Sequence, residues 1–306
     1  MSSEPVFQRV VIVGLGLIGS SLAHAIRRRW EQTTIIGFDI SRDVMDRARK
    51  LDFCDDIIEN PIAEVEKADL VLLCVPVGAM EEVGKIFGKH LKQGCVVSDT
   101  GSVKGSVVRA LESHIPEGVI FIPAHPVAGT ENSGPDAGFA ELFEERWCIF
   151  TPLAETDESA VKKLREFWEG CGAKVVSMDA EHHDLVLAVT SHVPHLIAFG
   201  IVDTAINLEE VKKSEVIKFS GGGFRDFTRI AASDAVMWRD IFLHNREAVL
   251  EMLNRFSGDL DGLRKAIEGG DADSIEDAIL RAQIIRHRIL EAGEDTKEED
   301  FGRRKQ

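Results

Sequence analysis

Near its start the chain carries three glycines in the spacing Gly-x-Gly-x-x-Gly, directly after the apolar run Val10–Val13. The motif reads Gly14-Leu15-Gly16-Leu17-Ile18-Gly19, and a stretch with helical spacing follows it. Between a strand and a helix, the first glycine permits a tight turn, the second lets a pyrophosphate approach the backbone, and the third lets helix and strand pack closely. The motif therefore predicts a dinucleotide site, with the helix N-terminus at Leu17 and Ile18 facing the phosphates.

An acidic residue closes the second apolar run. Asp39 follows Gly14 by 39 − 14 = 25 residues. A carboxylate at this place can accept hydrogen bonds from both ribose hydroxyls and repels a 2′-phosphate, which favours NAD over NADP. Two alternatives stay open at this point: Asp39 could cap the helix that follows it, and the nearby Arg42 leaves some room for NADP.

Apolar, β-branched runs alternate with helical stretches through the first half of the chain. Further runs stand at residues 34–38, 70–75, 96–98, 119–122, 148–151 and 174–177. Uninterrupted apolar strands separated by helices predict a parallel sheet covered on both faces. Because ligands bind at the carboxyl ends of such strands, we expect Val75 and Pro76 to line the cofactor crevice.

After Met178 the strand signals nearly vanish and helical spacing takes over. Residues 180–206 are predicted to form a long apolar helix interrupted by Pro194, and Gly269-Gly270-Asp271 separates two later helices. A helix that is apolar on several sides needs several partners, which a second subunit would supply. We therefore predict an α/β protein with a Rossmann-type dinucleotide-binding domain over residues 1–178 and an all-helical substrate and dimerisation domain over residues 179–306, assembled as a homodimer.

Composition narrows the choice of partners. The 306 residues include 36 Lys and Arg against 52 Asp and Glu, a formal charge of −16, which argues against nucleic acid. A small anionic substrate remains compatible, because a few local cations can dominate one pocket. The five cysteines are widely spaced without a Cys-x-x-Cys pair, so we expect neither a zinc site nor disulfides. No membrane span or signal peptide is expected, and the predicted location is the cytoplasm.

Two residues in the first half are candidates for chemistry. His125 follows an apolar strand, and an imidazole beside a cofactor crevice can take the hydroxyl proton when a carbinol is oxidised. Ser102 follows the strand that ends at Asp99. Its hydroxyl either hydrogen-bonds substrate or nicotinamide, or caps the helix that follows, and these two roles are compatible.

Two further candidates lie in the helical half. His192 and His195 stand three residues apart, and we expect His192 to be the structural member of the pair. A glycine-rich stretch precedes Arg225 and Arg229, which suggests an anion site because Arg binds carboxylates bidentately. Arg225 can instead pair with a neighbouring acid, so Arg229 is the predicted substrate-binding arginine. The metal-ligand spacing His-x-x-x-His is absent, and we predict no metal.

Together these residues resemble the prephenate/arogenate (cyclohexadienyl) dehydrogenases of tyrosine biosynthesis. The resemblance runs from Val10 to about Leu290 and rests on five ordered motifs, which are VVIVGLGLIGSSLA, SDTGSVK, HPVAGTENSGPDAGFAELFEERWCIFTP, TSHVPHLIAF and GGGFRDFTRIAASDAVMWRDIF. Five motifs in order are far more specific than the glycine pattern alone.

The resemblance implies an NAD-dependent oxidative decarboxylation. Prephenate would yield 4-hydroxyphenylpyruvate, and arogenate would yield tyrosine. His125 would take the C4 hydroxyl proton, and Ser102 would support that contact or orient the nicotinamide. His195 and Arg229 would hold carboxylate or hydroxyl groups of the substrate. Thr130 and Glu131 would also face the substrate. Glu131 is the residue expected to favour the amine of arogenate, unless it pairs with Arg229 instead.

Two other functions compete with this interpretation. A dehydrogenase of the β-hydroxyacid type would usually carry an acid–base lysine on the long helix, but residues 180–206 contain no Lys. A non-catalytic NAD-binding protein would bind the cofactor without turning over either substrate.

Overall fold

A computed structural model of the chain describes residues 4–130, 132–207, 215 and 218–291. The chain divides into two compact units, residues 1–249 and residues 250–306, and each is described by itself. The first helices beyond Met178 belong to the same compact unit as the sheet. The domain boundary expected at residue 178 stays a prediction.

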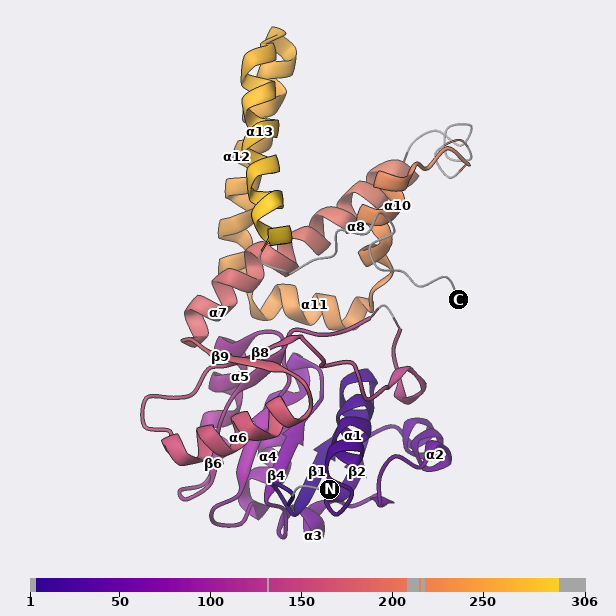
Figure 1. Cartoon of the computed structure of the whole chain (residues 1–306), viewed down its shortest axis with the longest axis vertical. Helices are drawn as coiled ribbons and strands as arrows, with labels where there is room; N and C mark the ends of the chain where they lie inside the picture. Colours follow the sequence, from indigo (N-terminus) through magenta and orange to yellow (C-terminus); the bar gives the residue numbers. More distant parts are fainter. Residues whose placement is uncertain (1–3, 131, 208–214, 216–217, 292–306) are drawn as a thin grey trace. The chain divides into compact units, whose positions relative to one another are not determined.

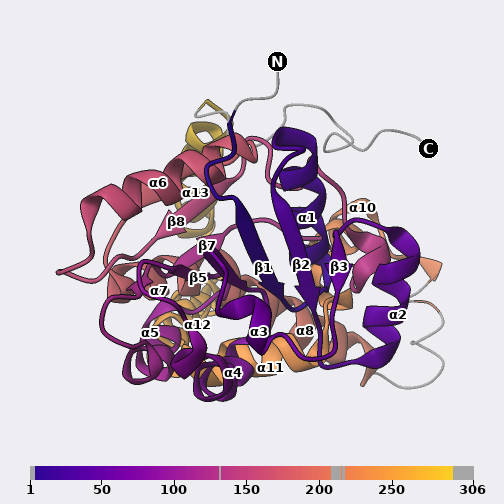
Figure 2. The ribbon, with the colours of Figure 1, turned by 90° about the horizontal axis from the view of Figure 1, so that it is seen from below.

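The centre of the first unit is a six-stranded sheet in the order β3-β2-β1-β4-β5-β6, with every pairing parallel (Figures 1 and 2). Its strands are β1 (Arg9–Val13), β2 (Thr34–Phe38), β3 (Asp56–Ile57), β4 (Leu70–Leu73), β5 (Val96–Asp99) and β6 (Ile120–Phe121). The order reverses at β1 and β4, where doubly wound folds bind their ligand. This arrangement confirms the predicted Rossmann-type fold.

Alternate side chains of the strands feed two separate cores, one on each face of the sheet. Val10 and Ile12 of β1 pack with α1 (Leu17–Arg29), α2 (Arg42–Leu51) and α6 (Glu158–Gly170). Val11 and Val13 pack on the opposite face with α3 (Ile62–Val65), α4 (Met80–Phe87) and α5 (Lys104–Leu111). Because both faces are buried, the strands are continuously apolar rather than alternating.

A second, three-stranded sheet differs from the single parallel sheet that was expected. It has the order β7-β8-β9, with β7 (Ala124–Pro126) antiparallel to β8 (Trp147–Phe150) and β8 parallel to β9 (Lys174–Ser177). The chain passes from β6 to β7 across Ile122 and Pro123. His125 therefore lies within β7 of the second sheet rather than in a loop after the first. The second strand was not expected because the sequence shows only one apolar run there.

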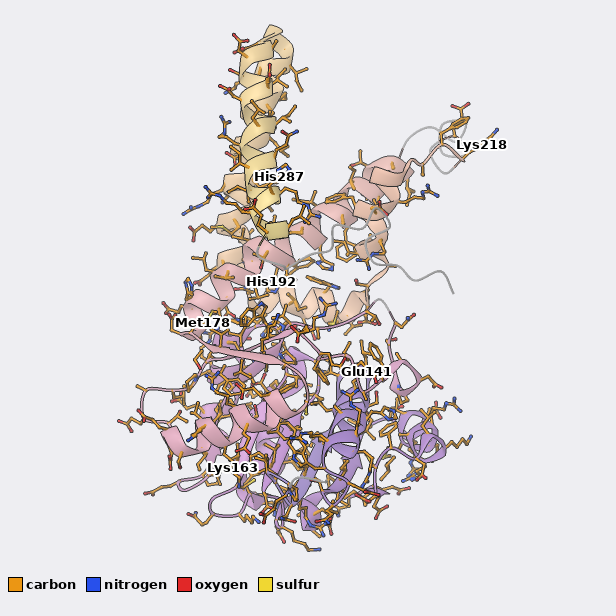
Figure 3. The ribbon with its side chains drawn as sticks, in the orientation of Figure 1. Glu141, Lys163, Met178, His192, Lys218 and His287 are labelled. Atoms are coloured by element: carbon orange, nitrogen blue, oxygen red, sulfur yellow. The ribbon has the colours of Figure 1, made fainter. Side chains whose placement is uncertain are left out.

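The helical half begins after Met178, where the chain leaves β9 (Figure 3). The predicted helix over residues 180–206 forms as α7 (Ala180–Leu187), a π-helical turn over Ala188–His192, and α8 (Val193–Ile206). Pro194 lies in the first turn of α8, where its missing N–H is tolerated. The interruption is therefore a π turn just before the proline, a feature frequent at functional sites.

Within the described residues after Ile206, the longer helices are α10 (Gly222–Thr228), α11 (Ala235–His244), α12 (Arg246–Gly269) and α13 (Ala272–Glu291). The first two belong to the first unit, and α11 adds Trp238 and Ile241 to one of its cores. Gly270 has a φ of +65° between the last two helices, which confirms the break predicted from the sequence.

One described segment bears on the expectation of no membrane span. Residues 180–206 are long and apolar enough to cross a membrane by length and composition, because no Asp, Glu, Lys or Arg occurs from residue 185 to residue 202. The polar residues Thr190, Ser191 and His192 had concealed this run. A single such segment is weak evidence for a span, since helices that pack in protein cores pass the same test. Here the segment packs against α10 and α11 and carries a buried, hydrogen-bonded His192.

Candidate active site

The glycine loop has the geometry of a phosphate cradle. Gly14 has a φ of +98°, and a Cβ there would collide with the backbone of Cys74 at the end of β4. A Cβ on Gly19 would collide with Gly14 O, so α1 can pack on the turn only without one. Gly16, in contrast, has no atom of the other described residues within 4 Å of its Cβ position, apart from its own chain neighbours and helix backbone. The open side of the loop thus lies where a pyrophosphate would approach the N-terminus of α1 at Leu17 and Ile18.

Asp39 sits against this loop. Its Oδ2 accepts a hydrogen bond from Leu15 N at 2.8 Å, and its Oδ1 accepts one from Ser41 N at 2.9 Å. The N-cap of α2 is Ser41, whose hydroxyl accepts from Val44 N, so Asp39 is not the cap of that helix. A carboxylate has about four acceptor positions, which leaves capacity for ribose hydroxyls. The arrangement fits NAD.

The strand ends beside the loop carry the other predicted cofactor residues. Val75 is half-buried and Pro76 exposed after β4, and a 3₁₀ turn over Val77–Ala79 follows them. A Cβ on Gly78 would lie 2.7 Å from Asp240 Oδ2, so α11 approaches this turn closely.

Ser102 lies in the turn between β5 and α5, and it does not cap α5. The N-cap is Val103, which forms no side-chain cap hydrogen bond. The cap is supplied from α7, since Asp184 accepts hydrogen bonds from Lys104 N at 2.7 Å and Gly105 N at 2.9 Å. The alternative of Ser102 as N-cap was therefore wrong, and the side chain is half-buried at the carboxyl end of β5.

The backbone just before His125 is held by a buried ion pair. Asp99 and Lys104 are both fully buried and form a salt bridge. Lys104 Nζ donates to Ala124 O at 2.6 Å, and Ala124 N donates to Asp99 Oδ1 at 3.3 Å. Both polar groups of Ala124 are thus satisfied by the pair, which fixes the peptide that carries His125.

His125 belongs to a buried chain of polar groups. Its side chain is 6% exposed, and its Nδ1 lies 2.8 Å from Nε2 of His183 on α7. His183 is completely buried, and its Nδ1 lies 2.8 Å from Asp184 Oδ1. The two imidazoles meet edge to face, with ring centroids 5.1 Å apart.

Burial keeps His125 neutral. Burial lowers the pKa of His125 well below 6.5, and electrostatic interactions with His183, Lys104 and His192 lower it further. Burial also lowers the pKa of His183, which the hydrogen bond to Asp184 partly opposes. A neutral imidazole at a cofactor site can accept a proton.

The pair His192 and His195 surrounds Trp238 of α11. Asn245 Nδ2 donates to His192 Nδ1 at 3.0 Å and to Asp184 O at 2.8 Å, and the buried Nε2 of His192 has no partner among the described residues. Burial lowers the pKa of His192 to about 4. His192 packs at one side of Trp238, at the position labelled in Figure 3. These contacts agree with the structural role expected for His192.

His195 stacks on Trp238 and interacts electrostatically with Arg229 of the predicted anion site. Its ring stacks on Trp238 with centroids 3.7 Å apart, and its Nδ1 lies 2.9 Å from Ser191 O. Burial lowers the pKa of His195, and the positive charge of Arg229 adds to this effect. Arg229 is exposed at the start of a 3₁₀ turn over Arg229–Ala232 that contacts α8. His192 interacts electrostatically with both His125 and His195, and Arg229 interacts in the same way with His195.

Two predicted substrate residues follow β7. Thr130 is exposed, and its Oγ1 accepts from Asn132 N at 3.2 Å. Glu131 lies outside the residues that the structure describes. Thr130 therefore lies on the surface, four residues after the end of β7. The role of Glu131 in favouring arogenate stays a prediction.

Sequence reasoning missed several residues of the buried polar chain around His125. His183 and Asp184 occur in the segment Glu-His-His-Asp on a helix predicted from apolar spacing, and adjacent polar residues there suggest only an exposed face. Lys104 ends the motif SDTGSVK, and its spacing alone indicates no role for its side chain. A buried lysine needs a buried acid, and Asp99, five residues earlier at a strand end, was the available signal.

Comparison with known proteins identifies both halves of the chain. Residues 22–177 match the family model described as "Prephenate dehydrogenase, nucleotide-binding domain". Residues 179–281 match the model described as "Prephenate dehydrogenase, dimerization domain". Together the two models cover most of the chain.

Similar proteins agree with these matches. A cyclohexadienyl dehydrogenase of Zymomonas mobilis is 44% identical over 281 residues, which are 92% of this chain and 96% of the relative. A prephenate dehydrogenase of Bacillus subtilis is 36% identical over 87% of this chain and 72% of its own length. The crystal structure of prephenate dehydrogenase from A. aeolicus in complex with hydroxyphenyl propionate and NAD⁺ has a TM-score of 0.85 at 38% identity, covering 92% of this chain and 98% of the other.

Proposed function

The chain belongs to the prephenate dehydrogenase family, and we propose that it oxidises and decarboxylates prephenate, arogenate or both, with NAD as cofactor. Prephenate would yield 4-hydroxyphenylpyruvate, and arogenate would yield tyrosine. The observation that carries the proposal is the buried, neutral His125, which lies in β7 just after the last strand of the nucleotide-binding sheet. The electrostatic interaction between Arg229 and His195 supports an anion site in the helical half.

The glycine loop and Asp39 are the residues that would hold NAD. Gly16 leaves space for the pyrophosphate, and Asp39 retains acceptor capacity for the ribose. Val75 and Pro76 would border the nicotinamide side of the crevice. When bound, NAD supplies the acceptor for the hydride that leaves C4 of the substrate ring.

His125 would take the proton of the C4 hydroxyl. As the hydroxyl loses its proton to the imidazole and C4 loses hydride, the ring carboxylate departs as CO₂ and the ring becomes aromatic. The C–C bonding electrons remain in the ring, which forms as a phenolate, and the His125 imidazolium returns the proton to the phenolate oxygen, so charge and atoms balance. Ser102, at the carboxyl end of β5, would orient the hydroxyl or the nicotinamide. Burial of His125 supports this role because the neutral form dominates at physiological pH.

The substrate carboxylates require cations in a protein whose net charge is −16. Arg229 and His195 would supply hydrogen-bond donors and positive potential to one end of the substrate. Thr130 would contact the substrate from the segment after β7. We retain Glu131 as the residue that would favour the amine of arogenate.

The helical half would form the dimer. Apolar side chains stay exposed along residues 180–206, among them Val189 in the π turn at 51% and Ile206 at the end of α8 at 55%. Only 28% of the most apolar part of this segment is buried within one chain. A second copy covering this face would bury it, in keeping with the match to a dimerization domain. We place the homodimer in the cytoplasm.

An assay of NADH formation tests the proposal. Prephenate and arogenate are each combined with NAD⁺ and with NADP⁺, and absorbance of the reduced cofactor is followed. We expect a rise with NAD⁺ and at least one substrate. No rise in any of the four combinations, with NAD⁺ binding intact by calorimetry, would indicate a cofactor-binding protein without this activity.

A further inference from the structure

We propose that His183 and Asp184 are positioning residues that hold His125 in the tautomer whose Nε2 atom carries no hydrogen. The proposal deepens the function proposed above and rests on it, because His125 can take the substrate's hydroxyl proton only through an unprotonated nitrogen. The Nδ1 atom of His125 is already engaged with His183, so Nε2 is the atom left to face the substrate.

Asp184 is surrounded by hydrogen-bond donors. Its Oδ1 accepts from Lys104 N at 2.7 Å and lies 2.8 Å from His183 Nδ1, while its Oδ2 accepts from Gly105 N at 2.9 Å. Both oxygens are therefore directed at N–H groups, as an ionised carboxylate at a helix N-terminus requires. The hydrogen between Asp184 and His183 must then reside on His183 Nδ1.

The tautomer of His183 determines the tautomer of His125. A neutral imidazole carries one hydrogen, and burial favours the neutral form of His183 by lowering its pKa. With Nδ1 protonated, Nε2 of His183 has a free lone pair. At 2.8 Å from His125 Nδ1 it can form a hydrogen bond only by accepting one. His125 is thus protonated on Nδ1 and bare on Nε2.

The same residue anchors both the backbone and the ring of His125. Lys104 donates its backbone N–H to Asp184, and its side chain donates to Ala124 O, the carbonyl just before His125. The peptide of His125 and the histidine chain that orients its ring therefore share one reference point at the start of α5. Because Asp184 comes from α7, the nucleotide-binding half carries the base and the helical half sets its tautomer.

The first test reads the tautomer directly. The full-length protein is labelled with ¹⁵N-histidine, and the side-chain nitrogens are observed by long-range ¹H–¹⁵N correlation at pH 7.5, with and without NAD⁺. His125→Asn assigns the His125 signals. We expect a protonated Nδ1 and an unprotonated Nε2, whereas a protonated Nε2 would overturn the proposal. This measurement needs no turnover, so it is independent of whether either substrate is used.

The second test removes the acceptor while keeping a ring. His183→Phe should lower kcat by about 10²- to 10⁴-fold, as expected for loss of a correctly protonated base. The KM for substrate should change by less than about threefold, because His183 does not contact the substrate. The ¹⁵N spectrum of this variant should show His125 divided between two tautomers. The adjacent, exposed His182 provides the matched control, because His182→Phe should keep the wild-type kcat and spectrum.

Asp184→Asn provides a second variant. Its amide would offer a donor to His183 Nδ1 or leave one N–H of α5 without an acceptor, and kcat should fall with the His125 signals altered. Binding of NAD⁺ and the far-ultraviolet circular dichroism spectrum establish that each variant is folded. Wild-type kcat in folded His183→Phe, or an unchanged His125 tautomer in both variants, would overturn the proposal.

Discussion

Asp39 Oδ2 accepts a hydrogen bond from Leu15 N at 2.8 Å, so the acid at the end of β2 holds the glycine loop that follows β1. The residue predicted to recognise the ribose is therefore also a structural part of the phosphate cradle. Its second oxygen accepts from Ser41 N at the start of α2. Cofactor choice and loop geometry are coupled through one carboxylate.

Substitution of Asp39 should affect both properties. Asp39→Ala should weaken NAD⁺ binding by about 10-fold or more, since a buried N–H loses its acceptor at a cost of roughly 1–3 kcal/mol, and should reduce discrimination against NADP⁺ because the repelling charge is gone. Titration calorimetry with both cofactors measures these changes. Asp39→Asn, which keeps an acceptor for Leu15, should lose discrimination with a smaller loss of NAD⁺ affinity. If both variants preferred NAD⁺ as strongly as wild type, the ribose contact would lie elsewhere.

The glycines of the loop should separate folding from binding. Gly16→Ala places its methyl group in space free of protein atoms, so thermal stability should stay within about 1 kcal/mol, while NAD⁺ affinity should fall because the methyl occupies the pyrophosphate side. Gly19→Ala drives its methyl into Gly14 O, and both stability and affinity should fall. Differential scanning fluorimetry and NAD⁺ titration on the two variants check this. Equal melting temperatures for both would contradict the packing role of Gly19.

Most of the nucleotide-binding architecture was predictable because its signals are local. The strand Thr34–Phe38 was predicted with the bounds that the structure gives, and the turn at Gly14 through Gly19 was predicted from spacing alone. Parallel strands buried on both faces are recognisable as apolar runs without reference to other parts of the chain. The second sheet was missed because β7 is only three residues long and contains a histidine and a proline.

The histidine chain could not be predicted because it depends on contacts far apart in the sequence. His125 and His183 are 58 residues apart, and Lys104 and Asp184 are 80 residues apart. Spacing rules describe neighbours on one helix or strand, and nothing local indicates that an acid on α7 caps α5. The anion site could be proposed from the sequence, because two arginines follow a run of glycines in an acidic chain. The stacking of His195 on Trp238 required the fold.

His125 and Arg229 should respond differently to mutation. His125→Asn removes the proton acceptor and should lower kcat by about 10²- to 10⁴-fold, with a modest effect on KM. Arg229→Ala removes a cation from the substrate's carboxylate and should mainly raise KM. Steady-state kinetics with NAD⁺ at saturation measures both. Near-normal kcat in His125→Asn would show that another group takes the proton.

The acid limb of the rate profile should lie below the usual range for histidine. Burial and the neighbouring cationic groups lower the pKa of His125 below 6.5, so the proton-accepting form persists into mildly acidic solution and is lost only as pH falls through the lowered pKa. A plot of kcat/KM against pH for prephenate or arogenate, at constant ionic strength, measures this limb. An acid limb centred above 6.5 would assign it to a group other than His125.

His192 should make the protein less stable in acid. Burial lowers its pKa from 6.5 to about 4 in the folded protein, so the unfolded chain binds the proton more tightly. The neutral form's contribution is fully present above pH 6.5 and is lost as pH falls toward 4. A shift of this size corresponds to about 3 kcal/mol of unfolding free energy. The lowered pKa values of His125 and His183 act in the same direction.

Urea unfolding at pH 7.5, 6 and 5, at one protomer concentration, measures the slope. His192→Phe should be less stable at pH 7.5, because Asn245 loses an acceptor, yet it should lose less stability than wild type on acidification. His287→Gln, on the exposed surface of α13, serves as the matched control and should keep the wild-type slope. If His192→Phe and wild type lost equal free energy between pH 7.5 and 5, the histidine beside Trp238 would not be held neutral by burial.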